Sequence, residues 1–562
     1  MAGQELKSGG QLLVDALRMH GADHVFCVPG ESYLAVLDAL YDAPEIAVTA
    51  CRQEGGAAMM AEAAGKLTGR PGICMVTRGP GATNASAGVH IAFQDSTPMI
   101  LFIGQIARGV SEREAFQEID YRRMFGEMAK WVAQIDQAER VPEFLARAFA
   151  TATSGRPGPV VLALPEDMLR DRVPVRPADP YQPVETHPGA DDLARLQEML
   201  AGAERPLAIV GGGGWDAAAC DNFRRFAEAY ALPVGASFRC QSYFDNAHAN
   251  YVGDVGIAAN PKLAARVREA DLLMLVGTRM GEITSDGYAL LDIPKPKKTL
   301  VHVYPGAEEL GRVYQPALAI NAGMRAFAAA AAELAPALPP PWRAGTEAAR
   351  ADFLAWTEPV ANPGPLQLAE VMVWLRDNLP PDAIVSNGAG NYSAWLHRFH
   401  RYRQYRCQLG PTSGSMGYAT PAAVAAKRLH PDRTVVAVTG DGCFQMTGQE
   451  FGAAVQYGAD IIVIVINNAM WGTIRMHQER SYPGRVIATS LGNPDFAKLA
   501  EAYGGYGEVV ERTEDFAPAF ERARSAGRPS LLELRVDPEA ITVTQSLSEI
   551  RAKAESAASK RD

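Results

Sequence analysis

Two short polar motifs in the last third of the chain carry the residue types that can hold a metal ion and a phosphate. Gly440-Asp441-Gly442 and Asn467-Asn468 each follow an apolar run that is typical of a buried strand, residues 434–438 and 461–466 respectively. Asp441 offers a carboxylate oxygen and Asn468 an amide oxygen. Mg²⁺ prefers such hard oxygens and usually completes its shell with phosphate oxygens and water. The two glycines allow a phosphate to approach the backbone closely, and a helix that starts after them favours an anion.

The motifs need a sheet to bring them together, and the rest of the chain has the pattern of parallel α/β domains. Short apolar runs alternate with Ala-rich helical segments throughout. The strand candidates are residues 24–28, 46–50, 73–77, 99–103, 160–164, 207–210, 272–276, 300–303, 383–385, 434–438 and 461–466. Ligand sites of parallel sheets lie at the carboxyl ends of the strands, where both motifs are expected.

Two proline-rich stretches divide the chain, and they are expected to be surface linkers between domains. They are residues 173–183 and 336–343. We predict three doubly wound parallel-sheet domains and a polar tail, at residues 1–180, 190–340, 362–545 and 546–562. After Val536 the sequence turns polar and charged and ends in Lys560-Arg561-Asp562, and this tail is expected to be a mobile lid or a frayed end.

Bulk composition narrows the class of protein. The chain has 562 residues, of which 48% are hydrophobic and 21% charged, with a net charge of −10 and no long basic run. Nucleic acid is therefore not expected as a partner. No apolar stretch has the length of a membrane span, and no signal-peptide core precedes the first domain. The seven cysteines form no C-x-x-C pair. We expect a cytoplasmic enzyme.

The stretch from Gly440 to Glu450 resembles the diphosphate motif of the thiamine diphosphate enzymes of the acetolactate synthase, benzaldehyde lyase and pyruvate oxidase group. That motif begins with Gly-Asp-Gly and ends with Asn-Asn. The resemblance implies that Asp441, Asn468 and the carbonyl of Met470 hold Mg²⁺. It also implies cofactor contacts from Gly440, Gly442, Cys443, Trp471, Gly472, Asn391 and Tyr392. Cys443 stands where serine is common, and Asn391-Tyr392 where Gln-His is frequent.

The same resemblance assigns residues to the organic part of the cofactor. The segment from Arg52 to Ala58 is similar to the family's Arg-His-Glu-x-x-Ala-Ala, which places Glu54 on the carboxylate that activates the aminopyrimidine ring. Gly414-Ser415-Met416-Gly417 is similar to the segment that bends the cofactor, with Met416 between its rings and the Gly414 carbonyl accepting from the 4′-amine. Without the resemblance, the residue types alone indicate a glutamate at the start of a helix for Glu54 and an ordinary core residue for Met416.

Further motifs extend the resemblance over essentially the whole chain, at residues 77–84, 116–120 and 155–160. Glu54 and Asp441 fall in different domains. In the family these two domains come from different subunits. The resemblance therefore implies a homodimer or homotetramer with active sites at the subunit interface.

The expected substrate pocket departs from that of acetolactate synthases. Glu31, followed by Ser32, stands where they carry glycine, and His477 stands where they carry a selecting tryptophan. Glu31 is either a proton carrier or an exposed helix-start residue. Gln117, Phe116 and Lys130 match further positions in or near the pocket of the group. The candidate proton carriers are His90, Gln94 and His477. We expect a small carbonyl substrate and 2-oxo acid decarboxylation, acyloin cleavage or carboligation. The loss of the selecting tryptophan disfavours the reaction of two pyruvates.

The middle block leaves two interpretations open. Gly-rich turns follow two of its strands at residues 211–214 and 277–279, and Arg108 and Arg279 match arginines that contact FAD in acetolactate synthases. However, residues 302–306 lack the acidic strand end of the FAD binders. The domain either binds FAD or serves packing only. The alternatives for the whole chain are an FAD-linked oxidase resembling pyruvate oxidase, or a non-catalytic paralogue that binds the cofactor.

Overall fold

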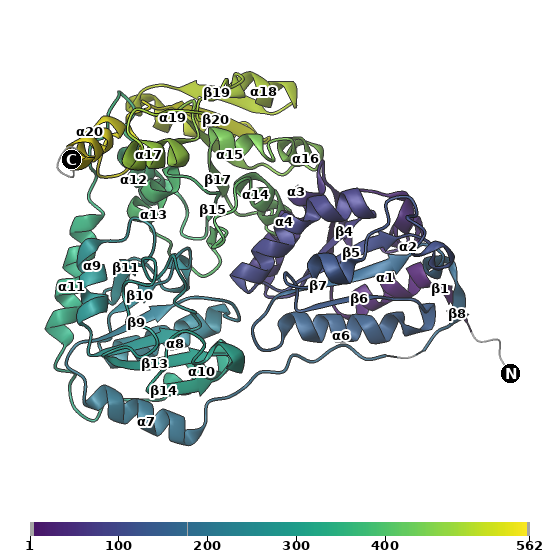
Figure 1. Ribbon diagram of the computed structural model, residues 1–562, viewed down its shortest axis with the longest axis horizontal. Helices are drawn as coiled ribbons and strands as arrows, with labels where there is room; N and C mark the ends of the chain where they lie inside the picture. Colours follow the sequence, from purple (N-terminus) through teal and green to yellow (C-terminus); the bar gives the residue numbers. More distant parts are fainter. Residues whose placement is uncertain (1–4, 177, 559–562) are drawn as a thin grey trace. The chain divides into compact units, whose positions relative to one another are not determined.

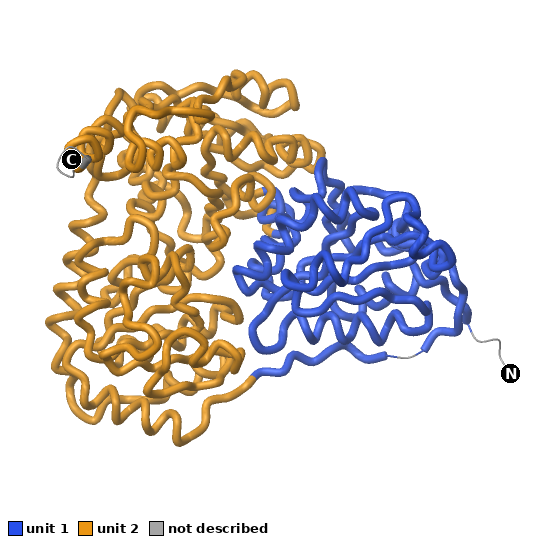
Figure 2. Tube along the Cα trace, viewed as in Figure 1, with its two compact units in different colours: residues 1–185, 424–429 blue, residues 186–423, 430–562 orange. Residues whose placement is uncertain are grey.

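The computed structural model describes residues 5–176 and 178–558 of the chain. They form two compact units, which Figure 2 shows in different colours. The first unit contains residues 1–185 and 424–429, and the second contains residues 186–423 and 430–562. Each unit is described by itself. In the described part of the chain, no helix combines the length and the apolar character that crossing a membrane requires.

The first unit is built on one six-stranded, wholly parallel sheet, with strand order β3-β2-β4-β5-β7-β6. Figure 1 labels β4, β5, β6 and β7 of this sheet. Its strands are β2 (His24–Cys27), β3 (Ala47–Ala50), β4 (Gly72–Val76), β5 (Met99–Gln105), β6 (Trp131–Gln134) and β7 (Pro159–Pro165). A small antiparallel pair, β1 (Leu6–Ser8) and β8 (Arg172–Pro174), joins the two ends of this domain. The central strands β4, β5 and β7 are buried along their whole length and mostly apolar because helices cover both faces of the sheet.

Helices pack on the two faces of this sheet. They are α1 (Gly9–Met19), α2 (Leu34–Tyr41), α3 (Glu54–Thr68), α4 (Gly79–Asp95), α5 (Tyr121–Phe125) and α6 (Val141–Thr153). Helices α1, α2 and α6 share one core with side chains such as Val25 and Ile100. Helix α3 begins where Gln53 accepts the Gly56 N–H at 3.0 Å, and it ends at Gly69, whose φ of 72° suits a left-handed cap.

The second unit begins with a sheet of order β11-β10-β9-β12-β13-β14, which with its helices we term the middle domain. Its strands are β9 (Pro206–Val210), β10 (Val234–Ala236), β11 (Tyr251–Asp254), β12 (Leu272–Val276), β13 (Thr299–Tyr304) and β14 (Leu318–Asn321). Its helices are α7 (Ala190–Ala201), α8 (Ala217–Ala229), α9 (Pro261–Glu269), α10 (Met324–Ala331) and α11 (Arg343–Trp356). All pairings are parallel.

A second sheet of the same unit, with its helices, forms the C-terminal domain, and its order is β16-β15-β17-β18-β20-β19. The strands are β15 (Ile384–Asn387), β16 (Gln408–Leu409), β17 (Val435–Gly440), β18 (Ile462–Asn467), β19 (Tyr506–Val510) and β20 (Ser530–Arg535). The helices are α12 (Leu368–Asn378), α13 (Tyr392–Phe399), α14 (Ala419–Leu429), α15 (Asp441–Gln445), α16 (Glu450–Gln456), α17 (Gly472–Ser481), α18 (Phe496–Ala502) and α19 (Thr513–Ser525).

Numbered from its own first strand, the C-terminal sheet has order 2-1-3-4-6-5, and so has the sheet of the first unit. The two domains therefore share one topology, whereas the middle domain has a different one. The predicted fold class, three parallel-sheet α/β domains, is confirmed. The exact domain boundaries stay a prediction.

Two segments differ from a simple linker or tail. The first proline-rich stretch begins inside strand β8, whose backbone pairs with β1 although Pro174 is part of it. The expected tail contains a helix, α20 (Leu547–Ala558), whose Leu547 and Ile550 are buried against α17. Apolar side chains on one face of this otherwise polar helix explain why it docks. Residues 559–562, at the charged end of the expected tail, lie outside the described residues.

A candidate diphosphate and metal site

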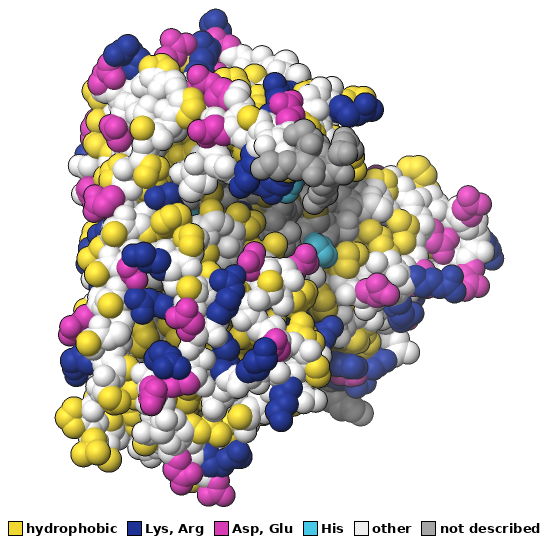
Figure 3. All heavy atoms as spheres, turned by 60° about the vertical axis from the view of Figure 1, so that its left-hand side comes forward, with side chains coloured by type: hydrophobic (Ala, Val, Ile, Leu, Met, Phe, Trp, Pro, Cys, Tyr) yellow, Lys and Arg dark blue, Asp and Glu magenta, His cyan; other side chains and the backbone are white. Residues whose placement is uncertain are grey.

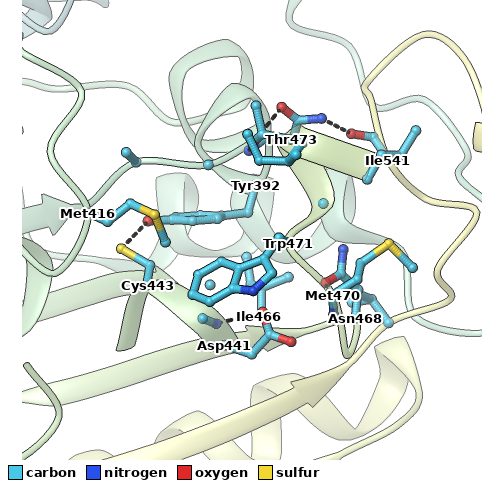
Figure 4. A pocket seen from close by; sticks show the side chains of 18 of the residues that line it. Tyr392, Met416, Asp441, Cys443, Ile466, Asn468, Met470, Trp471, Thr473 and Ile541 are labelled. Atoms are coloured by element: carbon cyan, nitrogen blue, oxygen red, sulfur yellow. Dashed lines mark hydrogen bonds between the residues drawn. The ribbon is translucent and has the colours of Figure 1, made fainter. Parts of the chain in front are cut away.

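A half-open cavity of about 250 Å³ lies in the C-terminal domain at the carboxyl ends of β15, β17 and β18. The strand order reverses between β15 and β17, so this is the switch point at which open parallel sheets bind ligands. Every residue of this domain that the sequence assigns to the cofactor lines the cavity: Asn391, Tyr392, Gly414, Met416, Gly440, Asp441, Gly442, Cys443, Asn468, Met470, Trp471 and Gly472. Figure 4 shows several of them around the cavity.

Asp441 is a buried carboxylate at this switch point, 3% exposed. Its Oδ1 accepts the Gly442 N–H at 2.8 Å, and its Oδ2 accepts the side-chain amide of Asn493 at 2.8 Å. The backbone N–H groups of Ala469 and Met470 also lower its pKa. Burial nevertheless raises the pKa of Asp441 above its ordinary value of 3.8. A negative charge held here is therefore incompletely compensated, and a cation would stabilise it.

In the turn after β18, the Asn468 side chain lies near Asp441 (Figure 4). Ala469 has a φ of 55°, which bends the chain back sharply. The Asn468 side-chain oxygen accepts the Met470 N–H at 3.3 Å, and the Met470 carbonyl accepts the Gly472 N–H at 2.9 Å. The Asn468 side-chain oxygen and the Met470 carbonyl oxygen each keep a second lone pair that is available to a cation. Trp471 N–H donates to the Thr489 carbonyl at 2.8 Å, which fixes the turn from outside.

The donor set fits a hard divalent cation bound together with phosphate. In residues 5–176 and 178–558, no group of three or more His, Cys, Asp and Glu side chains is placed to hold a metal ion. A cation at Asp441 would thus have one carboxylate, the Asn468 amide oxygen and the Met470 carbonyl, with room for phosphate oxygens in the adjoining cavity. Mg²⁺ is typically bound in this way, by few protein oxygens and a substrate or cofactor phosphate.

Gly440 and Gly442 are needed here for a reason that differs from the expected one. Neither has a positive φ. Instead, a Cβ on Gly440 would lie 3.0 Å from the ring of Tyr392, and a Cβ on Gly442 would lie 2.4 Å from the indole of Trp471. The two rings thus lie directly on the glycine backbone and form opposite walls of the cavity (Figure 4).

Met416 is presented by a loop in which glycines supply unusual backbone angles. Gly414 has a φ of 67° and Gly417 a φ of 83°, both in the left-handed region. The Gly417 N–H donates to the Cys443 Sγ at 3.1 Å, and the Tyr392 hydroxyl donates to the same sulfur at 3.6 Å. Cys443, which replaces the usual serine, therefore fixes this loop against α13.

Sequence reasoning missed three residues that hold the predicted ones in place. The side-chain amide of Asn493 donates both to Asp441 and to the Asn467 side-chain oxygen, each at 2.8 Å. Asn467 in turn donates to the buried carboxylate of Glu533 at 2.8 Å. Ile541 supplies the carbonyl that accepts from Asn391 at 3.0 Å. These residues lie outside the motif, so nothing in the local sequence points to them.

In the first unit, Glu54 is the first residue of α3, directly after the carboxyl end of β3. Its Oε2 accepts the side-chain amide of Asn84 at 2.9 Å. A Cβ on Gly81 would lie 3.4 Å from its Oε1, so the Gly-Pro-Gly turn at the start of α4 packs against the carboxyl group. Two motifs that the sequence assigns to the family therefore meet at Glu54.

Glu31 lies in the same unit, between β2 and α2, where its side chain is 67% exposed. It accepts from Arg78 at 3.1 Å, and Arg78 also donates to Glu166 at 2.6 Å. Arg78 is only 8% exposed, so its charge is shared by two carboxylates. Ser32 is 2.9 Å from the Thr77 hydroxyl. The cluster follows β2 and β4, on either side of the switch point of this sheet.

The other candidates are scattered or engaged elsewhere. His477 is exposed on α17 and does not line the cavity. The carbonyl of Gln117 accepts the Gly79 N–H at 3.0 Å, whereas Phe116 is 72% exposed. Lys130 donates to the carbonyls of Thr151 and Ser154, so it caps the end of α6 rather than reaching into a pocket. His90 is exposed on α4, and Gln94 and Arg279 are half-buried.

The middle domain does not fit FAD bound at its own switch point, between β9 and β12. The Trp215 indole N–H donates to the Gly211 carbonyl at 2.9 Å, and a Cβ on Gly277 would lie 3.0 Å from the same nitrogen. The indole, 3% exposed, thus lies between the two glycine turns, where a dinucleotide would bring its phosphates. Arg108, in the other unit, is held by Asp167 and Asp171.

His302 lies on β13 and offers no acidic strand end for a ribose. Its Nε2 is 3.0 Å from the Thr278 carbonyl, and burial lowers its pKa to about 4. The ring is therefore neutral and is directed at the backbone. The glycine-rich turns of this domain serve close packing in the described structure.

Comparisons with known proteins agree with this geometry. Three family models match successive parts of the chain. They are the N-terminal TPP binding domain, the central domain and the C-terminal TPP binding domain of thiamine pyrophosphate enzymes, at residues 7–124, 193–331 and 388–534. Thiamine pyrophosphate is thiamine diphosphate. The C-terminal match contains most of the residues that line the cavity, Asp441 among them, and the N-terminal match contains Glu54.

Curated relatives match almost the whole chain. The acetolactate synthase large subunit of Corynebacterium glutamicum is 32% identical, over 96% of this chain and 88% of its own length. Acetolactate synthase isozyme 2 large subunit of Escherichia coli is 31% identical, over 94% of this chain and 96% of its own length. The chain therefore belongs to the thiamine pyrophosphate enzyme family, as an acetolactate synthase-like enzyme of the carboligase or transferase type.

Proposed function

We propose that this chain binds thiamine diphosphate through Mg²⁺ in the cavity of its C-terminal domain, and forms or cleaves a carbon–carbon bond next to a carbonyl. The observation that carries the proposal is the buried Asp441 carboxylate, which faces the Asn468–Met470 turn at the sheet's switch point. Bound thiamine diphosphate supplies a carbon nucleophile that adds to the carbonyl carbon of a substrate.

The residues of the cavity have separable tasks in this proposal. Asp441, Asn468 and the Met470 carbonyl hold the metal ion, and the ion neutralises the diphosphate. Tyr392 and Trp471 form the walls and exclude water from the phosphates. Met416 lies where it can support a bent cofactor, which brings reacting groups into proximity.

Glu54 is proposed to hydrogen-bond the aminopyrimidine ring and to favour the tautomer that removes a proton. Asn84 supports this assignment because it donates to one carboxyl oxygen and orients the group. The other oxygen, Oε1, lies close to the Gly81 backbone and is the one proposed to face the ring.

The Glu31–Arg78–Glu166 cluster, with one guanidinium and two carboxylates, bears on the substrate. It carries a net negative charge when both acids are ionised. A second negative charge on a substrate would be disfavoured beside it. We therefore place neutral aldehydes and acyloins, as acceptors or cleaved substrates, ahead of a second 2-oxo acid.

Calorimetric titration with thiamine diphosphate, with and without Mg²⁺, tests the cofactor half of the proposal. We expect saturable one-site binding that requires Mg²⁺ and is lost in Asp441→Ala. Binding of equal strength in the presence of a chelator would contradict the metal assignment. A panel of 2-oxo acids, aldehydes and acyloins, assayed with both cofactors, then tests the chemical half. Turnover of none of them would favour the non-catalytic paralogue.

An FAD-linked oxidase is not favoured, because Trp215 lies at the switch point of the middle domain. We expect the purified protein to be colourless and to bind no added FAD in a fluorescence titration. A stoichiometric flavin spectrum in the purified protein would contradict this.

A homodimer or homotetramer, with Glu54 and Asp441 acting on one cofactor from different subunits, is the assembly that the family resemblance supports. Sedimentation or native mass spectrometry gives the subunit number directly. A cytoplasmic location stays a prediction from the sequence.

A further inference from the structure

One arginine side chain of the middle domain donates to the backbone of two loops that line the cavity of the C-terminal domain. Arg239 follows β10 and is only 7% exposed. Its Nη1 donates to the Pro411 carbonyl at 2.5 Å, and its Nη2 donates to the Gly388 carbonyl at 2.7 Å. One guanidinium therefore joins two separate loops, as the planar fork of arginine allows.

Both loops belong to the cavity. Gly388 directly precedes Ala389 and Gly390, which line it and lead into α13. The Pro411 carbonyl also accepts the Gly414 N–H at 3.0 Å, which closes the turn that presents Gly414 and Met416. Substitution of Arg239 would thus affect two loops: one leads to Tyr392, which forms a wall of the cavity, and the other presents Met416.

The local backbone is shaped for this contact. Arg239 has a φ of 62°, which is uncommon for a residue with a side chain and persists where the surroundings enforce it. A Cβ on Gly410 would lie 3.0 Å from the Arg239 side chain, so glycine leaves room for the guanidinium to pass. The Arg239 guanidinium also lies 4.8 Å from the centre of the Phe238 ring.

The neighbouring residues make the same junction rigid. Gln408 Oε1 accepts the Gln241 N–H at 2.8 Å, and the two side-chain amides are bonded to each other at 2.8 Å. The Asn246 N–H donates to the Tyr402 carbonyl, and the Tyr402 N–H donates to the Asn246 side-chain oxygen, each at 2.9 Å. The segment after β10 is thus a fixed support, and Arg239 is the part of it that extends to the cavity loops.

We propose that Arg239 is a positioning residue for the cofactor, by which the middle domain holds the Gly388–Asn391 and Pro411–Met416 loops in the geometry that binds thiamine diphosphate. The inference rests on the proposed function. In this proposal the middle domain contributes to the binding of thiamine diphosphate without itself binding a flavin.

The test compares three variants of the full-length protein. Arg239→Met removes the cation and keeps the length, and Arg239→Lys keeps one donor without the fork. Arg350→Met is the matched control: Arg350 also donates to backbone carbonyls, those of Asn246, Ala247 and Tyr251, but these do not line the cavity. The measurements are the Kd for thiamine diphosphate with Mg²⁺, the kcat, and the thermal midpoint without cofactor.

We expect Arg239→Met to raise the Kd about 10- to 100-fold, the range for losing charged hydrogen bonds. Arg239→Lys should fall between it and the unchanged protein. Arg350→Met should lower the thermal midpoint yet leave the Kd within about twofold, because its bonds reach carbonyls of the support and none of the loops that line the cavity.

Three outcomes would overturn the inference: an unchanged Kd in Arg239→Met, an equal rise in Arg350→Met, or, should Arg239→Met fail to fold, an unchanged Kd in Arg239→Lys. Absence of binding by the unchanged protein would instead refute the proposed function, and the inference with it.

Discussion

At the scale of single residues, the cavity is shaped by aromatic rings that lie on glycine. A methyl group at Gly442 would meet the Trp471 indole at 2.4 Å, so Gly442→Ala must displace that ring into the cavity. Overpacking of this kind costs about 1–3 kcal/mol. We expect a lower thermal midpoint, and a Kd for thiamine diphosphate raised at least about tenfold, which corresponds to 1.4 kcal/mol. Calorimetry measures both quantities.

The double variant Gly442→Ala with Trp471→Ala separates crowding from loss of a backbone contact. If crowding is the cause, Gly442→Ala lowers the thermal midpoint of the unchanged protein but not that of Trp471→Ala, because the indole is gone. An equal fall in both backgrounds would contradict the steric explanation.

Glu54 allows a sharper prediction because its proposed task is chemical rather than structural. Glu54→Gln retains size and the contact with Asn84, but loses the carboxyl group. We expect cofactor binding within a few-fold of the unchanged protein and a kcat lowered by about 10²- to 10⁴-fold, the usual range for acid–base groups. Steady-state kinetics with a substrate found in the panel gives the kcat.

Asn84→Ala is the companion variant. It leaves the carboxyl group but removes its orienting donor, so we expect a smaller fall in kcat. A Glu54→Gln variant with unchanged turnover would remove Glu54 from the mechanism.

At the scale of elements, α20 holds the helix that starts at the cavity. Glu479 on α17 is fully buried and accepts from Arg551 of α20 at 2.5 and 2.7 Å, and from Arg475 at 3.0 Å. Bonds from Arg551, and then from the Gly484 N–H and Arg475, lower the pKa of Glu479 from 4.5 to about 2. Because the folded pKa is lowered, the stabilisation is complete above pH 4.5 and is lost as the pH falls towards 2.

We therefore predict that α20 is released by acid at a higher pH when this pair is weakened. Arg551→Met should reduce the stability of the docked helix by about 1–3 kcal/mol, the value of hydrogen bonds to a charged group. Amide hydrogen exchange of residues 547–558, followed over pH, is the measurement. Arg524→Met removes an exposed pair with Glu521 and should change exchange little. Equal exchange in both variants would refute the role of the buried pair.

The sequence predicted central elements better than edge elements, for physical reasons. Strands β17 and β18 are buried on both faces, so their apolar runs and the turns after them were visible. Strands β16 and β19 lie at the edges of the sheet. The first has two residues and the second is mostly half-buried, so neither has a distinctive pattern.

The motif residues of the cavity were predicted from type and spacing. Arg239 could not be, because its contacts are made 149 and 172 residues away.

At the scale of the whole molecule, the first and third domains share a strand order, and each has candidate residues at the carboxyl ends of its strands. Glu54 follows the second strand of one sheet, and Asp441 follows the third strand of the other. Charge offers no comparable guide, since Figure 3 shows basic and acidic side chains interspersed over the face in view. The assembly must therefore be tested through the two sites themselves.

Co-expression of Glu54→Gln and Asp441→Ala chains with different affinity tags tests whether the two residues act from different subunits. Each variant alone is expected to be inactive. In a mixed dimer with sites shared between subunits, one site combines both altered residues and the other combines Glu54 of one chain with Asp441 of its partner. Random pairing then restores about a quarter of the wild-type activity, since half of the dimers are mixed and each has one intact site of two. If both residues acted within one chain, every site would carry one substitution and no activity would return.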